Sequence, residues 1–471
     1  MTSKPHATLR RWIPLTGLGL LALVAGSSFG QDSKTKPGLN IGRDSFVFDR
    51  LANLAQYGPG AEQRVDRDLQ TVAQISRALS ERGIKLTFVL VPMVQRIYED
   101  RLPANYVLPK GAKNLYDHAM VVLKKSGVFA PNLNDPFLAA RKAADATGFP
   151  LYMRQDNHWS SLGALEASKV LAAAMRSQYG PQLAAIPEVK STVDLLPPVL
   201  YKGNYFEKLS NEDRASITQE KIRPIQYTSL SSGGLLDVGV PQIALAGTSF
   251  SYMKQFGFVN LLGHELERDV LNVAQSGKGE WTPLLDYLAS DAFQATPPKI
   301  IVWEMPEEHL ALGFPPVAWA GDWPRNQFLL ETAANIRGDC GSAGKGVSAV
   351  TGTDFTFNAT PTSNSASVAS SGTGSFVKYQ FAATIRNNQY LSVKVKSNSS
   401  DSFIVQGANE SNQYLSKIGG FGVVHRVNVP LYTLADSSIR ALTVRAAPGS
   451  DLSLEDAKLC AMPSELMSTL K

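Results

Sequence analysis

Ile84-Lys85-Leu86-Thr87-Phe88-Val89-Leu90-Val91 is the stretch that decides the fold. It is mostly apolar and rich in β-branched side chains, and Pro92 stops it, which is typical of a strand buried on both faces of a sheet. The preceding segment 61–82 carries apolar residues at helical spacing, and Gly83 follows it at a C-cap position. A helix that leads straight into a buried strand is the unit of a layered α/β protein, so we predict a mainly parallel sheet covered by helices.

The alternation of helix and strand continues to about residue 310. In sheets of this kind, functional side chains gather where the carboxyl ends of strands meet the starts of helices. The spacing predicts helices over 111–125 and 160–175, the second with Ser160 or Ser161 as its N-cap, a short strand opening at Val128-Phe129, and further strands in the short apolar runs 242–246, 258–262 and 299–304.

The first thirty residues have the pattern of an export signal. Lys4, Arg10 and Arg11 precede an apolar run over 13–25, and small residues follow it as far as Gly30. We therefore predict a secretory signal peptide over 1–30. An uncleaved membrane anchor is the alternative, but the run falls short of the ~20 residues that span a bilayer. Removal of this segment lowers the formal charge from +5 to +2, so basicity does not indicate a nucleic-acid partner.

The chain has two cysteines, Cys340 and Cys460, 120 positions apart. In an exported protein an even pair predicts a disulfide, and two free buried thiols are the alternative. A loop of this length would stabilise the fold by about 4 to 5 kcal/mol in the chain-entropy model.

The composition changes near Cys340, which predicts an α/β domain over 31–335 and a β-sandwich module over 340–471. In the second region, 390–396 alternates cleanly, which predicts buried Leu391, Val393 and Val395 and outward-facing Ser392, Lys394 and Lys396. Eleven basic and eight acidic residues give the module a charge of +3. A modestly basic face formed by Lys394, Lys396 and Arg426 is a candidate surface for an anionic polysaccharide. Other strands are expected within 376–385, 402–406, 421–429 and 439–445.

Two short motifs carry candidate catalytic residues. Asp156 lies two positions before His158 at the start of a predicted helix, and Ser249 follows the apolar run 242–246 in Gly247-Thr248-Ser249. A carboxylate that fixes one imidazole nitrogen leaves the other free to take a proton from a serine hydroxyl. A surface turn, half a metal site, or an ordinary glycine turn are the alternatives for these motifs. The catalytic interpretation requires the Ser249 hydroxyl to lie within hydrogen-bond reach of His158.

Several segments, in order, resemble one family. They are Gly42-Arg43-Asp44-Ser45-Phe46-Val47-Phe48, Val91-Pro92, Arg96-Ile97-Tyr98, Asp156-x-His158-Trp159, Gly247-Thr248-Ser249 and Ile301-Val302-Trp303-Glu304-Met305-Pro306-Glu307. Over roughly 40–310 the chain resembles secreted polysaccharide O-acetyltransferases related to the SGNH hydrolases, and most of all the periplasmic alginate O-acetyltransferases of the AlgX and AlgJ group. The resemblance implies a Ser249, His158 and Asp156 triad. Because the serine block follows the Asp/His block here, it also implies a circularly permuted SGNH-hydrolase-like domain.

The resemblance implies acetyl transfer through an acetyl-serine to a sugar hydroxyl of an exported uronate polymer, alginate (polymannuronate). The backbone N–H of Ser249 is the first oxyanion donor to consider, and Asn272 and Gly277 are further candidates beside the alternative of a helix start and a flexible loop. Arg154 and Arg96 could bind sugar carboxylates or form surface ion pairs. Trp159 either stacks on a sugar or packs in the core.

The chain contains no P-loop, dinucleotide fingerprint or zinc motif, so we expect no cofactor and no metal. Glu307-Glu308-His309 is expected to be a solvated turn. The resemblance implies a periplasmic location, a carbohydrate-binding role for the C-terminal module, and a membrane-associated acetyl-donor protein and other export components as partners. A non-catalytic polysaccharide-binding scaffold and a carbohydrate acetylesterase are the alternative functions.

Overall fold

The computed structural model describes residues 35–230 and 240–310, apart from positions 50, 52–53, 55–56 and 58–60, together with 325–337 and the C-terminal strands given below. The predicted signal peptide over 1–30 and the predicted domain boundary between 335 and 340 fall wholly or partly outside these residues. Among the described residues, none of the helices combines the length and the apolar character needed to cross a bilayer.

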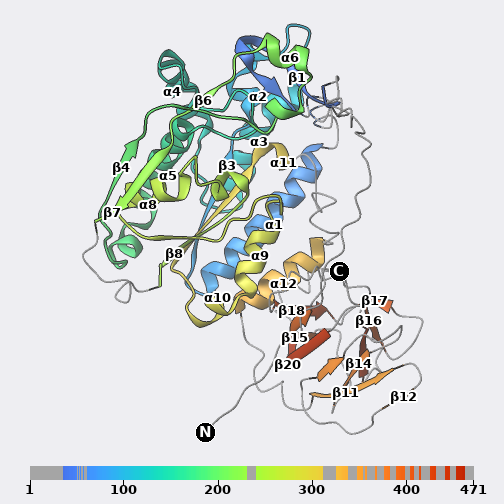
Figure 1. The fold of residues 1–471 in the computed structure, drawn as a ribbon. Helices are drawn as coiled ribbons and strands as arrows, with labels where there is room; N and C mark the ends of the chain where they lie inside the picture. The colour runs from blue at the N-terminus through green and yellow to red at the C-terminus, as the bar shows by residue number, and fades with distance from the viewer. Residues whose placement is uncertain are drawn as a thin grey trace, which may run out of the picture.

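A four-stranded parallel sheet forms the centre of the first region (Figure 1). Its strands, in spatial order, are β3 (Lys85–Val91), β10 (Ile300–Pro306), β8 (Ile243–Ala246) and β9 (Val270–Asn272). Every residue of β8 and β10 is buried, as are all but the first of β3. The prediction of a mainly parallel α/β sheet is therefore confirmed, and the physical reason is the continuous apolar run in each central strand.

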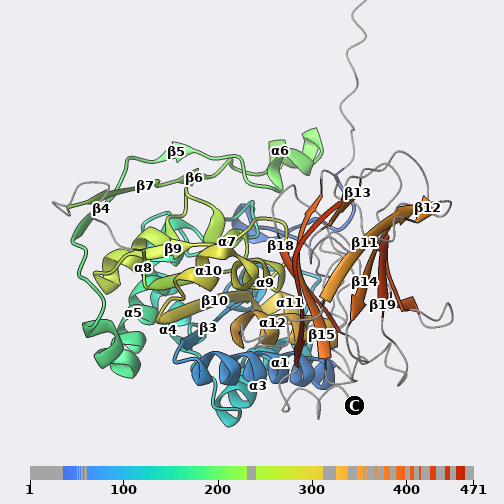
Figure 2. The same cartoon turned by 90° about the horizontal axis from the view of Figure 1, so that it is seen from below.

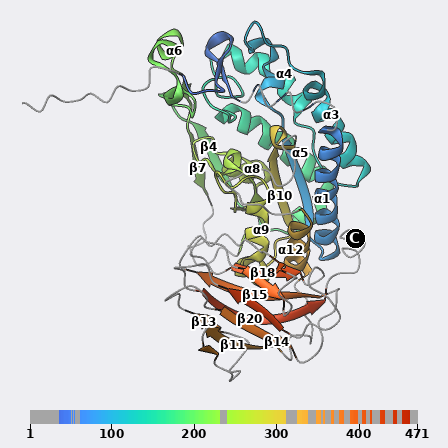
Figure 3. The same cartoon turned by 90° about the vertical axis from the view of Figure 1, so that its right-hand side faces the viewer.

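Helices cover both faces of this sheet. In Figure 3, α1 (Ala61–Glu81) lies on one side of β10 and α8 (Phe258–Leu266) on the other. The predicted helices are present: α1 buries its apolar stripe, and α5 begins after the N-cap Ser160. The remaining helices are α2 (Val94–Ile97), α3 (Lys110–Lys125), α4 (Asn134–Ala146), α5 (Ser161–Ala184), α6 (Asn211–Ser216), α7 (Ser249–Tyr252), α9 (Thr282–Ala289), α10 (Asp291–Ala295), α11 (Glu307–Leu310) and α12 (Arg325–Arg337).

Two strand predictions are wrong. The apolar run 258–262 begins α8, because Gly257 adopts a left-handed φ of 71° and starts a helix that packs on α5. Val128-Phe129 forms no ladder; one backbone hydrogen bond, from Phe88 N–H to the Phe129 carbonyl (2.9 Å), brings it beside β3. In an apolar run this short, periodicity cannot distinguish a strand from a buried helix.

An arm of short antiparallel strands leaves the end of α5 and returns before β8. β4 (Ser191–Leu195) pairs with β7 (Ile225–Ser229), and β5 (Val199–Leu200) pairs with β6 (Lys221–Ile222). Figure 2 shows the four strands together along one side, with α6 at the end of the arm. Near the N-terminus, β1 (Asn40–Ile41) pairs with β2 (Val47–Phe48) around the short helix η1 (Arg43–Ser45).

Strands make up the described C-terminal part. Two antiparallel sheets have the orders β12-β11-β14-β19-β16-β17 and β13-β20-β15-β18, as the alternating sequence predicts. Cys460 is buried in β20 and is not free, but Cys340 lies outside the described residues, so their disulfide stays a prediction. The strands are β11 (Val347–Thr353), β12 (Thr356–Phe357), β13 (Ala366–Val368), β14 (Phe376–Phe381), β15 (Gln389–Ser397), β16 (Ile404–Gly407), β17 (Gln413–Tyr414), β18 (His425–Pro430), β19 (Ala441–Arg445) and β20 (Leu452–Ala461).

The second of these sheets packs against the α/β region through α9 and α12 (Figure 3). The Asn428 amide of β18 donates to Asn335 Oδ1 of α12 at 2.9 Å, and both side chains are buried. Leu391, Val393 and Val395 are buried as predicted, but Ser392 is only 1% exposed, contrary to the expectation that it faces out. Both faces of this sheet are covered, so the alternation of polar and apolar residues along β15 does not distinguish exposed side chains from buried ones.

Candidate active site

The Asp-His turn, residues Arg154–His158, lies directly before α5. Tyr152 and Trp159 form an antiparallel bridge, and the Met153 N–H donates to the His158 carbonyl at 3.0 Å. The residues between them are forced into a tight turn that places Asp156 and His158 side by side. Ser160 then caps α5 by accepting the N–H groups of Leu162 and Gly163.

The nucleophile turn, residues Gly247–Ser251, lies at the carboxyl end of β8. The Thr248 hydroxyl accepts the Phe250 N–H as the N-cap of α7, and Ser249 is the first helical residue. A strand that ends in a glycine and is followed at once by a helix aims the serine hydroxyl away from the sheet. Ser249 is half-buried, whereas Asp156 and His158 are both 2% exposed.

The structure brings the three predicted residues into one hydrogen-bonded line. His158 Nδ1 lies 2.6 Å from Asp156 Oδ1, and His158 Nε2 lies 2.7 Å from Ser249 Oγ. When Nδ1 donates its proton to the carboxylate, Nε2 is left as the acceptor for the serine hydroxyl. This geometry meets the distance requirement for a base and its nucleophile.

Asp156 receives more hydrogen bonds than the one from His158. The Asn204 N–H donates to Oδ2 at 2.9 Å, the Tyr201 hydroxyl to Oδ2 at 3.2 Å, and the Asn204 amide to Oδ1 at 3.2 Å. Burial acts to raise the pKa of Asp156, but these donors and His158 outweigh it, so the pKa lies below the ordinary value. The carboxylate therefore stays charged and can stabilise an imidazolium at His158.

Aromatic rings enclose the imidazole. The ring centroid of His158 lies 4.9 Å from that of Phe250 and 5.5 Å from that of Phe256. Trp159 is fully buried and donates its indole N–H to the Phe250 carbonyl at 3.1 Å. Of the two roles considered for Trp159, it therefore takes the core one, and it fixes the segment that carries Phe250.

A buried carboxylate holds the nucleophile turn. Glu304, at the end of β10, is fully buried and accepts the Thr248 N–H at 2.7 Å, the Thr248 hydroxyl at 3.0 Å and the Ser251 hydroxyl at 2.9 Å. Burial raises its pKa although these donors favour the charged form. A Cβ at Gly247 would lie 2.5 Å from Glu304 Oε2, so only glycine allows this approach.

A second buried carboxylate holds the Asp-His turn. Glu220 Oε2 accepts the Arg154 N–H at 2.7 Å, and Oε1 accepts the Gln155 N–H at 2.9 Å. Burial raises the pKa of Glu220 to about 7. On the other side of the turn, a Cβ at Gly203 would lie 2.0 Å from the Gln155 carbonyl, which lets the 201–204 loop reach Asp156. Sequence reasoning missed Glu220 and Glu304.

The oxyanion candidates differ in their placement. Asn272 ends β9 beside β8, and its amide donates to the Ser251 carbonyl at 3.2 Å, so it contacts the nucleophile turn. Gly277 lies in an exposed turn at φ 74°, and a Cβ there would have no other heavy atom within 4 Å. Of these two residues, Asn272 is therefore the one that contacts the nucleophile turn, and the Ser249 N–H, at the first position of α7, stays the first candidate donor.

The two arginines proposed for carboxylate binding also differ. The Arg96 side chain is 10% exposed and pairs with the fully buried Glu307 at 2.6 Å, and the carbonyls of Ala112 and Lys113 accept two more of its N–H groups. It therefore has a structural role rather than the predicted substrate contact. The solvated turn expected at 307–309 is likewise wrong, because Glu307 begins the buried helix α11. Arg154 instead lines a pocket described below.

Two of the three C-terminal cations proposed to form a basic face are paired with acidic side chains of the protein. Lys394 pairs with Asp291 of α10 at 3.1 Å, and Arg426 pairs with Asp456 at 2.5 Å and contacts the Ser392 hydroxyl. Lys396 lies in β15, but its side chain is outside the described set. Among the described residues, no group of three or more His, Cys, Asp or Glu side chains is placed to hold a metal ion.

One family model matches the region that contains both turns. Residues 39–307 match the family model for the SGNH hydrolase-like domain of acetyltransferase AlgX. The chain belongs to this family. The SGNH-like domain lies in the part of the chain that contains both turns, with the Asp/His block before the serine.

The similar sequences and solved structures include AlgJ and AlgX proteins. The chain is 30% identical over 312 residues to a protein from Pseudomonas syringae pv. tomato named "Probable alginate O-acetylase AlgJ", covering 63% of this chain and 75% of that one. The O-acetyltransferase domain of Pseudomonas putida AlgJ aligns with a TM-score of 0.53 at 25% identity, covering 64% of this chain and all of that one. Pseudomonas aeruginosa AlgX shares the fold over 90% of this chain and 94% of its own, with a TM-score of 0.64 at 20% identity.

Proposed function

We propose that this chain is an O-acetyltransferase that moves an acetyl group through Ser249 onto a hydroxyl of an exported uronate polysaccharide, alginate. One observation carries the proposal: the line from Asp156 through His158 to Ser249, with contacts of 2.6 Å and 2.7 Å. These roles and distances are those of serine acyl transfer.

The first half of the reaction forms an acetyl-serine. His158 takes the Ser249 hydroxyl proton as Oγ attacks the carbonyl carbon of the acetyl donor. The tetrahedral species collapses when the bond to the donor's leaving group breaks, and His158 returns the proton to that group. Asp156 stabilises the imidazolium in between. The Ser249 N–H is the first candidate donor to the developing oxyanion.

The second half reverses these roles. His158 takes the proton of a sugar hydroxyl, whose oxygen attacks the acetyl carbon, and Ser249 leaves with that proton. Transfer prevails over hydrolysis only if a sugar hydroxyl, rather than water, reaches the acetyl carbon. Phe250 and Phe256 pack against the buried His158 ring, whereas Ser249 is half-buried, so the serine is the member of the triad that an acceptor can meet.

The relatives support alginate as the acceptor, because their names place them in alginate O-acetylation and alginate biosynthesis. An exported polymer also agrees with the predicted signal peptide over 1–30, from which we propose a periplasmic location. A polymer-modifying enzyme of the envelope needs an acetyl source across the membrane, so we propose a membrane-associated donor protein and other export components as partners. We propose a polysaccharide-holding role for the C-terminal sheets.

The test is acetyl transfer to an oligomannuronate in the presence of an activated acetyl ester. Wild-type protein is expected to add about 42 Da per acetyl group to the sugar, the mass of C2H2O moved by acyl transfer. Ser249→Ala should add none, while the exposed Ser216→Ala, on α6, should behave as wild type.

The two alternative functions give different results in the same assay. An acetylesterase would release acetate at a rate that does not change when the oligosaccharide is added, and the sugar would gain no mass. A scaffold would retain the oligosaccharide but turn over no ester. Either pattern in wild-type protein would refute the proposed transferase.

A further inference from the structure

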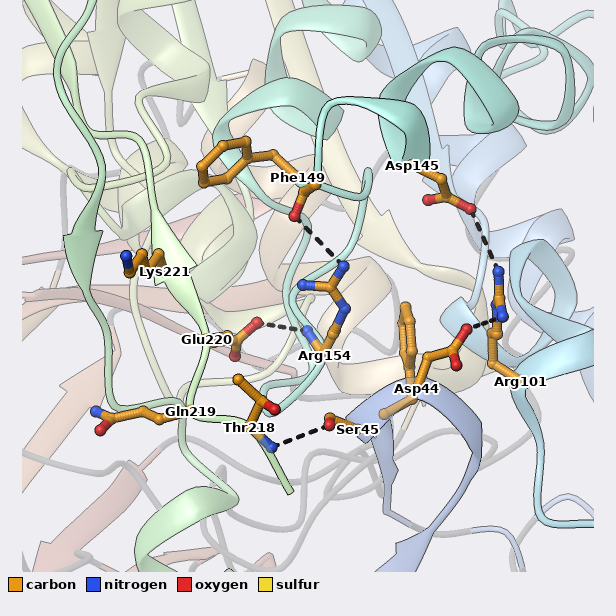
Figure 4. A pocket seen from close by; sticks show the side chains of 12 residues that line it. Asp44, Ser45, Arg101, Asp145, Phe149, Arg154, Thr218, Gln219, Glu220 and Lys221 are labelled. Atoms are coloured by element: carbon orange, nitrogen blue, oxygen red, sulfur yellow. Dashed lines mark hydrogen bonds and ion pairs between the residues drawn. The ribbon is translucent and has the colours of Figure 1, made fainter. Parts of the chain in front are cut away.

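A cavity of about 520 Å³ lies beside the Asp-His turn (Figure 4). Five segments form it: the η1 turn, the short segment that ends at Arg101, the end of α4 with the loop that follows it, the Asp-His turn, and residues 218–221, which lead into β6. Its volume is in the range of sites that hold small ligands. Arg154 is the residue of the Asp-His turn that lines it.

The carboxylates of this cavity are already engaged by the protein. Asp44 and Asp145 both pair with Arg101, as Figure 4 shows. Both oxygens of Glu220 accept backbone N–H groups of the Asp-His turn. Because each acid is paired, little acceptor capacity is left for a ligand.

The cations have more capacity to spare. The Arg154 guanidinium donates to one acceptor in the described structure, the Gly148 carbonyl, at 3.3 Å, and it lies 5.9 Å from the ring centroid of Phe46. Lys221 is exposed, and no described residue accepts a hydrogen bond from its ammonium group. The hydrogen-bonding capacity still open in the cavity is therefore mainly cationic, which favours an anionic ligand.

The wall between these cations is aromatic. Phe149 lines the cavity and is half-buried, and the Arg223 guanidinium lies 6.0 Å from its ring centroid. Apolar surface with a few fixed polar groups is the usual lining of a small-molecule site. A pyranose ring presents C–H groups to such a surface while its carboxylate and hydroxyls face the polar groups.

The cavity is connected to the triad by a short piece of backbone. Arg154 and Asp156 are two residues apart, so their Cα atoms are separated by at most about 7 Å. A sugar bound at Arg154 would therefore lie near the triad without occupying the position of the reacting hydroxyl. Two different sugar units of one polymer could therefore occupy the cavity and the position of the reacting hydroxyl.

We propose that this cavity is a subsite for a uronate residue of the acceptor polymer, with the sugar carboxylate bound by Arg154 and Lys221 and the sugar ring against Phe149. This inference rests on the proposed function. It adds that the protein recognises the charge of a sugar other than the one acetylated, and so prefers acceptors longer than a single sugar.

The test measures binding of a mannuronate hexamer to the full chain, by calorimetry, apart from catalysis. Arg154→Gln and Lys221→Gln are each expected to raise Kd about tenfold, the loss expected of one charge-assisted hydrogen bond. The exposed Lys169→Gln on α5 is the matched control and should bind as wild type. Lys221 is exposed, so its variant is expected to fold, which thermal unfolding would check.

A neutral hexamer of the same length should bind weakly and equally to wild type and both variants. The proposal is overturned if the two variants bind the mannuronate hexamer as wild type does, or if the neutral hexamer loses affinity to the same extent. Acetyl transfer by wild type with unchanged binding in the variants would remove the subsite and leave the proposed function intact. Loss of binding in the variants, without any acetyl transfer by wild type, would support the subsite and refute the proposed function.

Discussion

The nucleophile turn and the Asp-His turn are held in the same way but in different surroundings. In each, a distant buried glutamate accepts backbone N–H groups: Glu304 from Thr248, and Glu220 from Arg154 and Gln155. Glu304 is sealed in the sheet and also accepts two hydroxyls of its turn. Glu220 lies at the wall of a cavity. The comparison indicates a fixed nucleophile beside an Asp-His turn that a ligand can reach.

The largest effect is expected on the Asp-His turn itself. Asp156→Asn removes the charge that orients and stabilises His158, so kcat for acetyl transfer should fall about 10³- to 10⁴-fold, the scale of this change in related proton relays. Steady-state kinetics would measure it, with the exposed Asp117→Asn on α3 as the control. A loss below tenfold would mean that the turn does not orient the base.

A smaller loss is expected when the support of the nucleophile turn is removed. Glu304→Ala leaves the Thr248 N–H and two hydroxyls without their buried acceptor and lets Ser249 shift, so kcat should fall about 100-fold. Stability should also drop, by about 1 to 3 kcal/mol per unsatisfied group. Kinetics and denaturant unfolding would measure both.

The matched control for Glu304 is Glu62→Gln, an exposed change on α1. Glu304→Gln keeps the volume and one acceptor oxygen, and it should recover part of the lost rate. If Glu304→Ala unfolded more easily but kept full kcat, the fixed position of the nucleophile would not depend on this carboxylate.

The smallest effect concerns the pH dependence of stability. The pKa of Glu220 is about 7 in the folded protein, against 4.5 ordinarily, so the folded state binds more protons between these values and loses stability as pH rises from about 4.5 to about 7. The difference corresponds to roughly 3 kcal/mol. Glu304 and Glu307, whose pKa values burial also raises, contribute in the same direction.

Glu220→Gln removes one of these titrations, so the fall in melting temperature between pH 5 and pH 8 should become smaller than in wild type. Glu212→Gln, exposed on α6, should leave it unchanged. An identical pH dependence in wild type and Glu220→Gln would show that Glu220 is not the buried acid that the comparison of the two turns requires.

The sequence predicts the triad residues and the parallel sheet because both leave local patterns. An Asp-x-His before a helix cap and a serine after an apolar run are visible within a few residues, as is the strand 84–91. The prediction of a strand at 258–262 is wrong because the helix there depends on the backbone of Gly257. The solvated turn at 307–309 failed because Arg96, which pairs with Glu307, is 211 positions away.

The two supporting glutamates also show that local sequence patterns do not reveal contacts between distant segments. Glu304 did leave a trace, since a single charge inside the apolar run 300–306 implies a buried and specifically paired carboxylate. Glu220 left none: it lies in a polar segment, and its partners are backbone N–H groups 65 and 66 positions earlier. Contacts of that range depend on the fold and cannot be seen in residue spacing.

The central claim is that Ser249 carries the acetyl group. Wild-type protein mixed with an activated acetyl ester and quenched in acid before turnover completes should yield the peptide containing Ser249 with a gain of about 42 Da, the mass of one acetyl transferred to oxygen. The gain should be absent in Ser249→Ala and should disappear from wild type when oligomannuronate is added before the quench. Acetyl found on another residue, or an acetylated sugar produced by Ser249→Ala, would contradict the claim.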